Sequence, residues 1–321
     1  MQNSLRQRRI GVEIEYSNLP LERSARIISG LFGGTIEKRS RYDYRVTGTE
    51  LGDFALELDL KLLKRLAADP TFARLSEIFG DPDALAIWIE STASMIVPYE
   101  IAAPPVAITR LDQIDRLVEQ LRLAGATGTS HAIQYAFGMH LNIEPPALDV
   151  ETVLRHFRAF LMLQLWLERQ AEVNITRKIS PFIGPFDETY VRKVLDPDYR
   201  PDCGTFIDDY IDYHPTRNLS LDLLPLFAYW DAARVFAQLP DEKIKPRPAF
   251  HYRLPNSKID LFRWRVSDEW ELWRIVELLA DNPEQFERLR DAYMESLEDL
   301  FGDDDLWIER SHRCVLDLLS P

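Results

Sequence analysis

The chain of 321 residues lacks several features that mark large classes of protein. It has only two cysteines, Cys203 and Cys314, which lie far apart and form no CxxC pair. Neither a disulfide framework nor a zinc ribbon is therefore predicted, and a reducing compartment is the simpler expectation. No apolar run approaches the length that a bilayer requires, and residues 1–9 are polar and basic without the apolar stretch of a signal peptide. We therefore expect a cytoplasmic protein with no membrane partner.

Clustered positive charge is also missing. The 38 Lys and Arg residues are scattered and are outnumbered by 52 Asp and Glu residues, which gives a formal charge of −14. Nucleic-acid binding depends on clustered Lys and Arg, so a nucleic-acid partner is not expected. An acidic protein can still bind a nucleoside triphosphate, provided that divalent cations lie between its carboxylates and the phosphates.

No linker rich in Ser, Gly or Pro divides the chain, and no internal repeat is visible. The hydrophobic share of 46% is enough for a large buried core. We predict one catalytic unit, residues 1–265, with a helical extension, residues 266–321, packed on it. The sequence leaves the oligomeric state, including a homo-oligomer, open.

Short strands alternate with helices along the first part of the chain. Strands with one apolar face are predicted at residues 8–16, 54–60, 95–102 and 137–144, a strand pair at 35–47 and a further strand at 249–256. Helices are predicted at 21–32, at 111–121 behind a Thr109 and Asp112 capping pair, at 150–172 behind an Asp149 cap, and after 266. Residues 177–218 show no sustained periodicity and are predicted to be irregular. The fold class is therefore α+β.

The polar faces of the predicted strands carry almost only acids and one histidine. They hold Glu13 and Glu15, Glu57 and Asp59, Glu100, and His140, Asn142 and Glu144. A face that merely meets water mixes basic and hydroxyl side chains among its acids, because like charges opposite one another destabilise a sheet. Taken alone, Glu57 and Asp59 fit a solvated edge equally well, and His140 fits a hydrogen-bonded core histidine better. Together these residues favour a divalent-cation site. Oxygen ligands with a single imidazole suit Mg²⁺ or Mn²⁺ better than zinc, and Mg²⁺ commonly binds substrate phosphates, which indicates a nucleoside triphosphate.

Several motifs resemble those of the amidoligase family, which is related to glutamine synthetase and to glutamate–cysteine ligases. The stretch Gly11-Val12-Glu13-Ile14-Glu15 resembles the family's GxExE opening, Glu100 to Pro105 its ExxxPP element, and Phe137-Gly138-Met139-His140 its GxH strand. The order of the motifs also agrees. Residues 247–253 are similar to the RPxxExR strand of glutamate–cysteine ligases. The resemblance covers roughly residues 8–265, with two departures: Asn142 stands where relatives often have a second histidine, and His251 where a glutamate ligand is expected.

The resemblance implies a largely antiparallel, curved sheet like that of glutamine synthetase, with packed helices. It implies an ATP- and Mg²⁺-dependent ligase that joins a carboxylate, expected to be glutamate-like, to a small amine through an acyl phosphate. The implied metal ligands are Glu13, Glu15, Glu100 and His140, with Glu57 or Asp59 as supplementary ligands.

Protein positive charge should assist such a reaction. The candidates for catalysis are Arg253, which the resemblance places at the transferred phosphate, Arg217 and Arg177; those for nucleotide binding are Arg247, Lys245 and Lys178. Each of them fits a plain salt bridge in an acidic protein equally well.

Two alternatives stay open at this point. A phosphotransferase or phosphohydrolase would use the same metal ligands without forming an amide. A non-catalytic nucleotide-binding protein is suggested by the two departures at His251 and Asn142.

Overall fold

The computed structural model describes residues 8–58, 98–129, 137–172, 184–298 and 303–320. The chain divides into two compact units, each built from segments distant in sequence. The N-terminal unit comprises residues 9–140 and 256–266, and the C-terminal unit comprises residues 1–8, 141–255 and 267–321. Within both units the described strands pair antiparallel, and helices pack beside them, so the predicted α+β class is confirmed.

In the N-terminal unit, five strands follow the order β2-β3-β4-β5-β1. They are β1 (Arg9–Tyr16), β2 (Thr35–Lys38), β3 (Asp43–Thr49), β4 (Gly52–Leu58) and β5 (Tyr99–Ala102), and the short β6 (Val106–Ala107) pairs with the start of β1. The predicted period-two strand is confirmed in β1, where Ile10, Val12, Ile14 and Tyr16 are fully buried and the side chains of Glu13 and Glu15 are partly exposed. This alternation leaves one face of the strand for polar side chains.

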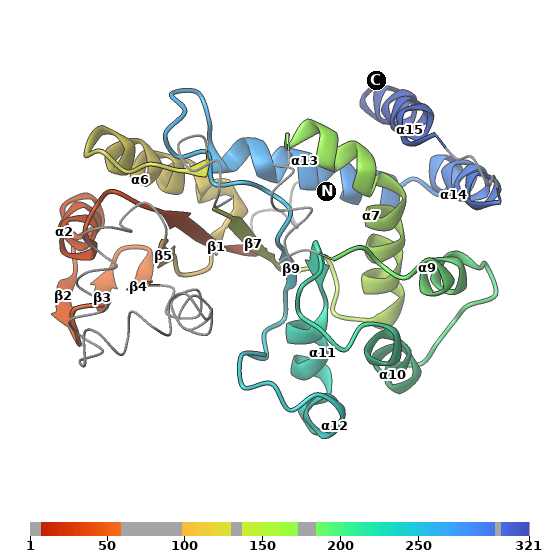
Figure 1. The fold of residues 1–321 in the computed structure, drawn as a ribbon, viewed down its shortest axis with the longest axis horizontal. Helices are drawn as coiled ribbons and strands as arrows, with labels where there is room; N and C mark the ends of the chain where they lie inside the picture. The colour runs from red at the N-terminus through yellow and green to blue at the C-terminus, as the bar shows by residue number, and fades with distance from the viewer. Residues whose placement is uncertain (1–7, 59–97, 130–136, 173–183, 299–302, 321) are drawn as a thin grey trace, which may run out of the picture. The chain divides into compact units, whose positions relative to one another are not determined.

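Two helices cover the apolar side of these strands. They are α2 (Leu21–Phe32) and α6 (Leu111–Leu123), which contact each other, and α2 also contacts β3 (Figure 1). Glycines 33 and 34 with positive φ end α2 as predicted. The predicted capping pair before α6 is wrong, because a 3-10 turn, Ile108–Arg110, precedes the helix and Arg110 occupies the N-cap without a side-chain hydrogen bond.

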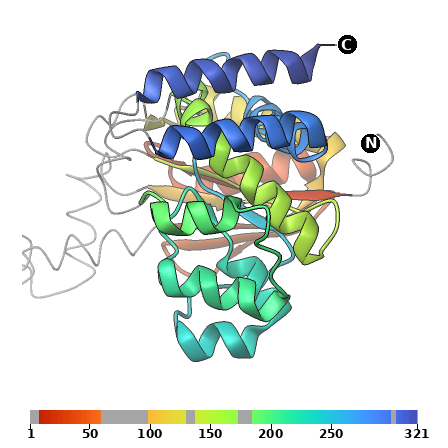
Figure 2. The same cartoon turned by 90° about the vertical axis from the view of Figure 1, so that its right-hand side faces the viewer.

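The C-terminal unit contains a three-stranded ladder and most of the helices found among the described residues. The strand β9 (Phe250–Tyr252) pairs on one side with residues 141–143 of β7 (Met139–Ile143) and on the other with β8 (Leu221–Asp222). The helices are α7 (Val150–Gln170), α9 (Glu188–Leu195), α10 (Cys203–Tyr213), α11 (Leu224–Trp230), α12 (Ala232–Gln238), α13 (Val266–Ala280), α14 (Pro283–Leu297) and α15 (Asp304–Leu319). The last two run side by side and both contact α7 (Figure 2).

One predicted segment folds differently from expectation. Residues 184–218, predicted to be irregular, contain α9 and α10. Each helix begins at an aspartate, Asp187 or Asp202, whose carboxylate accepts a backbone hydrogen bond from the residue three positions on. The two helices are only eight and eleven residues long, too short for a periodic pattern to stand out between the neighbouring prolines.

A buried ion pair fixes the start of the described chain to α13. Both terminal nitrogens of Arg8 donate to the carboxylate of Glu277, at 2.9 and 2.5 Å, and the Arg8 guanidinium also donates to the carbonyl of Glu144. The indole of Trp273 donates to the same carboxylate at 3.0 Å. The charges are therefore paired and hydrogen-bonded, as burial requires.

Among the described residues, no helix is both long enough and apolar enough to span a bilayer.

Candidate active site

Three glutamates of the N-terminal unit lie in one row across neighbouring strands. In the register of the ladder Glu15 of β1 is directly opposite Glu100 of β5, and Glu100 is directly opposite Glu57 of β4. Directly opposite residues have Cβ atoms about 4.5–5.5 Å apart, so the three side chains leave the sheet on one face. We call Glu15, Glu57 and Glu100 the carboxylate row. The sequence pattern places each of these three acids on the polar face of its own strand. The structure shows that they are neighbours across the sheet.

The carboxylate of Glu15 is held by a backbone group. Its Oε2 accepts a hydrogen bond of 2.6 Å from the amide of Gly138, while the amide of Glu15 donates to the carbonyl of Gly138 at 3.1 Å. A charge-assisted hydrogen bond of this kind fixes the orientation of a carboxylate more firmly than solvent does. Residue 138 therefore docks the segment before β7 against β1.

Two positions further along the same strands, Glu13 faces a histidine. Its Oε2 lies 3.0 Å from Nδ1 of His140, and His140 is only 9% exposed. Both residues offer atoms that could bind a metal ion. A carboxylate beside an imidazole on a partly buried surface provides one hard and one borderline ligand, which suits Mn²⁺ and Mg²⁺ as well as other first-row metals.

In the C-terminal unit a second polar row crosses three strands. Asn142 of β7 is directly opposite His251 of β9, and His251 is directly opposite Asp222 of β8. Nδ1 of His251 lies 3.3 Å from Oδ2 of Asp222. His251 is 2% exposed and Asp222 is fully buried.

The buried carboxylate of Asp222 is compensated from several sides. The amide of Leu224 donates to its Oδ1 at 3.0 Å, and Nε of Arg217 lies 3.5 Å from its Oδ2. Burial alone would raise the pKa of Asp222, but the hydrogen bond from His251 and the charges of Arg217 and Arg253 hold that pKa below its usual value. Asp222 is therefore ionised at neutral pH.

Two of the predicted arginines lie near the carboxylate of Asp222. Arg217 forms the ion pair with Asp222, and the guanidinium of Arg253 donates to the backbone carbonyl of Arg217. Arg253 follows directly after β9, and its own amide donates to the carbonyl of Ser220 at 2.8 Å. Two guanidinium groups and one imidazole thus lie around a single buried carboxylate.

The other predicted residues are placed less tightly or lie outside the described residues. Arg247 is half-buried and its amide donates to the carbonyl of Pro225, whereas Lys245 is exposed. Asp59, Arg177 and Lys178 lie outside the described part of the chain.

Asp222 was missed by sequence reasoning. The signal was present, because a single aspartate stands between leucines at 221, 223 and 224, and an isolated charge in an apolar run must be paired or hydrogen-bonded when buried. The strand around it has only two residues, so no period-two pattern could mark it.

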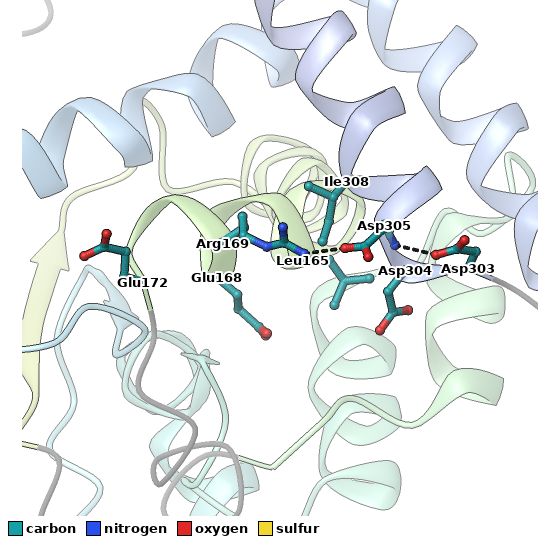
Figure 3. A pocket seen from close by; sticks show the side chains of 8 residues that line it. All are labelled: Leu165, Glu168, Arg169, Glu172, Asp303, Asp304, Asp305 and Ile308. Atoms are coloured by element: carbon teal, nitrogen blue, oxygen red, sulfur yellow. Dashed lines mark hydrogen bonds and ion pairs between the residues drawn. The ribbon is translucent and has the colours of Figure 1, made fainter. Parts of the chain in front are cut away.

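A separate cavity lies in the C-terminal unit between the end of α7 and the start of α15 (Figure 3). It has a volume of about 670 Å³, and its lining consists of Leu165, Glu168, Arg169, Glu172, Asp303, Asp304, Asp305 and Ile308. Arg169 turns toward Asp305 and pairs with it. Five carboxylates against one paired guanidinium disfavour a phosphate ligand, and no predicted site residue lines this cavity.

Comparison with known proteins identifies a family. The model of a family described as "Putative amidoligase enzyme" matches residues 6–275 of the chain. No curated protein and no solved structure matches it.

Proposed function

The chain belongs to the amidoligase family, whose model covers residues 6–275, and from this premise we propose that it is an ATP- and divalent-cation-dependent ligase that joins a carboxylate to an amine. The family description supports an enzyme that forms amide bonds. The dependence on ATP and on a metal, the intermediate and the substrates are our proposal. We also propose that the strands belong to a curved sheet like that of glutamine synthetase.

The carboxylate row is the observation that carries this proposal. Glu15, Glu100 and Glu57 stand opposite one another, an arrangement that costs stability through repulsion unless cations neutralise it. Glu13 of β1 and His140 of β7 add a carboxylate and an imidazole in contact with each other. The donor set therefore fits divalent cations, and such cations would let ATP approach a protein with a formal charge of −14.

We propose that Glu13, Glu15, Glu100 and His140 hold the cations, with Glu57 as a supplementary ligand and Asp59 as a further candidate. When bound, the cations would neutralise the phosphate oxygens of ATP. The hydrogen bond from Gly138 keeps the Glu15 carboxylate in one orientation, so this side chain would lose less conformational entropy when a cation binds.

The chemistry has two steps. A carboxylate oxygen of the substrate attacks the γ-phosphorus of ATP, the bond from that phosphorus to the bridging oxygen breaks, and ADP leaves with an acyl phosphate formed. The nitrogen of the amine then attacks the acyl carbon, loses a proton and expels phosphate. Most of the catalysis of such steps comes from positioning and charge neutralisation.

The arginines would supply the protein's share of positive charge. Arg253 is proposed to contact the transferred phosphoryl group, and Arg217 to hold the substrate carboxylate with its forked guanidinium. Their common neighbour Asp222 keeps the two guanidinium groups together. Arg177 is a further catalytic candidate, and Arg247, Lys245 and Lys178 are proposed to contact the nucleotide.

A glutamate-like carboxyl group and a small amine or polyamine are the proposed substrates. Because ATP is consumed, we propose that the enzyme works in the cytoplasm, where its cysteines Cys203 and Cys314, both free in the structure, would stay reduced.

Product analysis tests the proposal. The purified chain is incubated with Mg²⁺-ATP and a panel of carboxylates, with and without hydroxylamine as the amine. A ligase releases ADP and phosphate in step with hydroxamate, and only when both carboxylate and amine are present. Phosphate release from ATP alone would favour a hydrolase, and phosphate transfer to an alcohol or guanidine would favour a phosphotransferase. Binding of Mg²⁺-ATP without any product would favour a non-catalytic role.

A further inference from the structure

Asp222 occupies an unusual place for a charged residue. It is fully buried and its neighbours Leu221, Leu223 and Leu224 are fully buried as well. An ionised carboxylate in such surroundings costs several kcal/mol unless its oxygens are hydrogen-bonded. The buried position therefore calls for a reason beyond packing.

The two carboxylate oxygens of Asp222 have different partners. Oδ1 accepts from the amide of Leu224, which begins α11. Oδ2 lies 3.3 Å from Nδ1 of His251 and 3.5 Å from Nε of Arg217. One oxygen thus anchors the carboxylate to the backbone, and the other is aimed at the imidazole.

This contact decides which ring nitrogen of His251 carries the proton. An ionised carboxylate can only accept hydrogen bonds, so a hydrogen bond between Oδ2 and Nδ1 requires the proton on Nδ1. In the neutral ring the lone pair is then on Nε2. His251 is one of the residues whose side chain offers a ligand atom for a metal ion, and a lone pair on Nε2 is what that role requires.

The register places His251 between two polar residues. His251 lies between Asp222 and Asn142, so its carboxylate partner approaches from the β8 side of the strand and its other strand neighbour is β7. Metal-binding histidines generally donate their second ring nitrogen to a carboxylate or carbonyl, which fixes the ring and raises its basicity.

We propose that Asp222 is a positioning residue that accepts a hydrogen bond from Nδ1 of His251 and so holds Nε2 as a ligand for a divalent cation. The proposal rests on the metal-dependent function proposed above for the use of that cation, but the tautomer of His251 can be observed without any turnover. It also gives a physical role to the histidine that replaces the glutamate expected at this position.

The test uses the full chain labelled with ¹⁵N in its histidines. Long-range ¹H–¹⁵N correlation spectra at pH 7.5 identify the protonated nitrogen of each ring, and the signals of His251 are assigned by their loss in His251→Gln. The expected result for the wild type is a proton on Nδ1 of His251. In Asp222→Asn the amide can donate to the ring, so the proton is expected to move to Nε2.

Cation binding gives the second readout. Calorimetric titration with Mn²⁺ alone should show at least a tenfold loss of affinity in Asp222→Asn, since the loss of a carboxylate behind a metal-binding histidine typically costs about 10- to 100-fold. The matched control is Asp209→Asn, which removes another ion-paired carboxylate of the C-terminal unit that accepts from Tyr199 and pairs with Lys193. The control should change neither the tautomer nor the affinity, and circular dichroism should show both variants folded.

The outcomes separate the two proposals. A wild-type His251 protonated on Nε2, a wild type that binds no Mn²⁺, or an Asp222→Asn variant with unchanged affinity overturns the role of Asp222. Absence of hydroxamate in the presence of the predicted tautomer and affinity loss overturns the ligase proposal alone. The wild-type spectrum decides the tautomer even where Asp222→Asn does not fold.

Discussion

Nδ1 of His140 lies 3.0 Å from Oε2 of Glu13, although 127 positions separate the two residues in the sequence. The contact joins the polar face of β1 to the start of β7. It brings the first carboxylate of the GxExE motif together with the histidine of the GxH motif, as binding to one shared metal ion would require. Our first prediction follows from this pair.

The Glu13 and His140 pair should be needed for cation binding and dispensable for folding. Glu13→Gln and His140→Ala each remove one ligand, so Mn²⁺ affinity should fall at least tenfold and ligase turnover should be lost, while the circular dichroism spectrum stays the same. His312→Ala is the control, since it removes an exposed imidazole of α15 whose Nδ1 accepts a hydrogen bond from Trp166. Wild-type affinity in either site variant would remove the pair from the metal site.

We also expect Mn²⁺ to bind more tightly than Mg²⁺, because an imidazole ligand favours the softer ion.

Glu100→Gln should stabilise the protein in the absence of metal. Glu100 is directly opposite both Glu15 and Glu57, so a neutral amide relieves two like-charge contacts, each worth about 0.2–1 kcal/mol. Urea unfolding in EDTA should show a higher midpoint than the wild type, and added Mn²⁺ should raise the midpoint of the variant less than that of the wild type. A lower midpoint in EDTA would show that repulsion within the carboxylate row is already compensated.

Arg253→Ala should slow turnover more than it weakens ATP binding. A group that contacts the transferred phosphoryl oxygens acts mainly in the transition state, so kcat should fall by about 10²-fold while KM for ATP changes by less than about threefold. Arg253→Lys, which keeps the charge but loses the forked geometry, should recover part of the rate. An unchanged kcat would remove Arg253 from the reaction.

The buried pair of Arg8 and Glu277 predicts a large effect of a single substitution on stability. The side chains are 8% and 5% exposed, and removal of Glu277 leaves a buried guanidinium without its partner. Glu277→Ala should therefore lower the free energy of unfolding by about 3–5 kcal/mol. The exposed pair of Arg26 and Glu22 is the matched comparison, where Glu22→Ala should cost less than about 1 kcal/mol. Equal effects in urea unfolding would contradict the role of burial.

What the sequence predicts well is the local pattern. The alternation of Ile10, Val12 and Ile14 with Glu13 and Glu15 identifies both the strand and its polar face, because the side-chain period of a strand is a local property. The same reasoning gives α7, whose Asp149 cap accepts from the amide of Thr152 as predicted.

What the sequence cannot supply is the register between strands. The kinds of residue at positions 15, 57 and 100 indicate a metal site, but only the pairing of β1, β5 and β4 puts them in one row. The pairing is decided by packing between distant segments, which leaves no periodic signal. Asp222 escaped for a related reason, since its two-residue strand is formed only by pairing with β9.

Acid should destabilise the folded chain through His214. Its Nε2 accepts a hydrogen bond of 2.9 Å from the amide of Asp187, and the rings of Phe186, Tyr190 and Tyr210 surround it. Burial lowers the pKa of His214 to about 4, against 6.5 for an ordinary histidine. The folded state therefore keeps the ring neutral in a range where the unfolded chain takes up a proton.

The sign of the effect follows from that difference. The contribution of neutral His214 to stability is complete above pH 6.5, is lost progressively as the pH falls from about 6.5 to about 4, and changes little below that. Urea midpoints measured across this range should fall with a shallower slope in His214→Gln than in the wild type, because the variant has no ring to protonate. Parallel curves for the wild type and His214→Gln would show that protonation of this ring does not oppose folding.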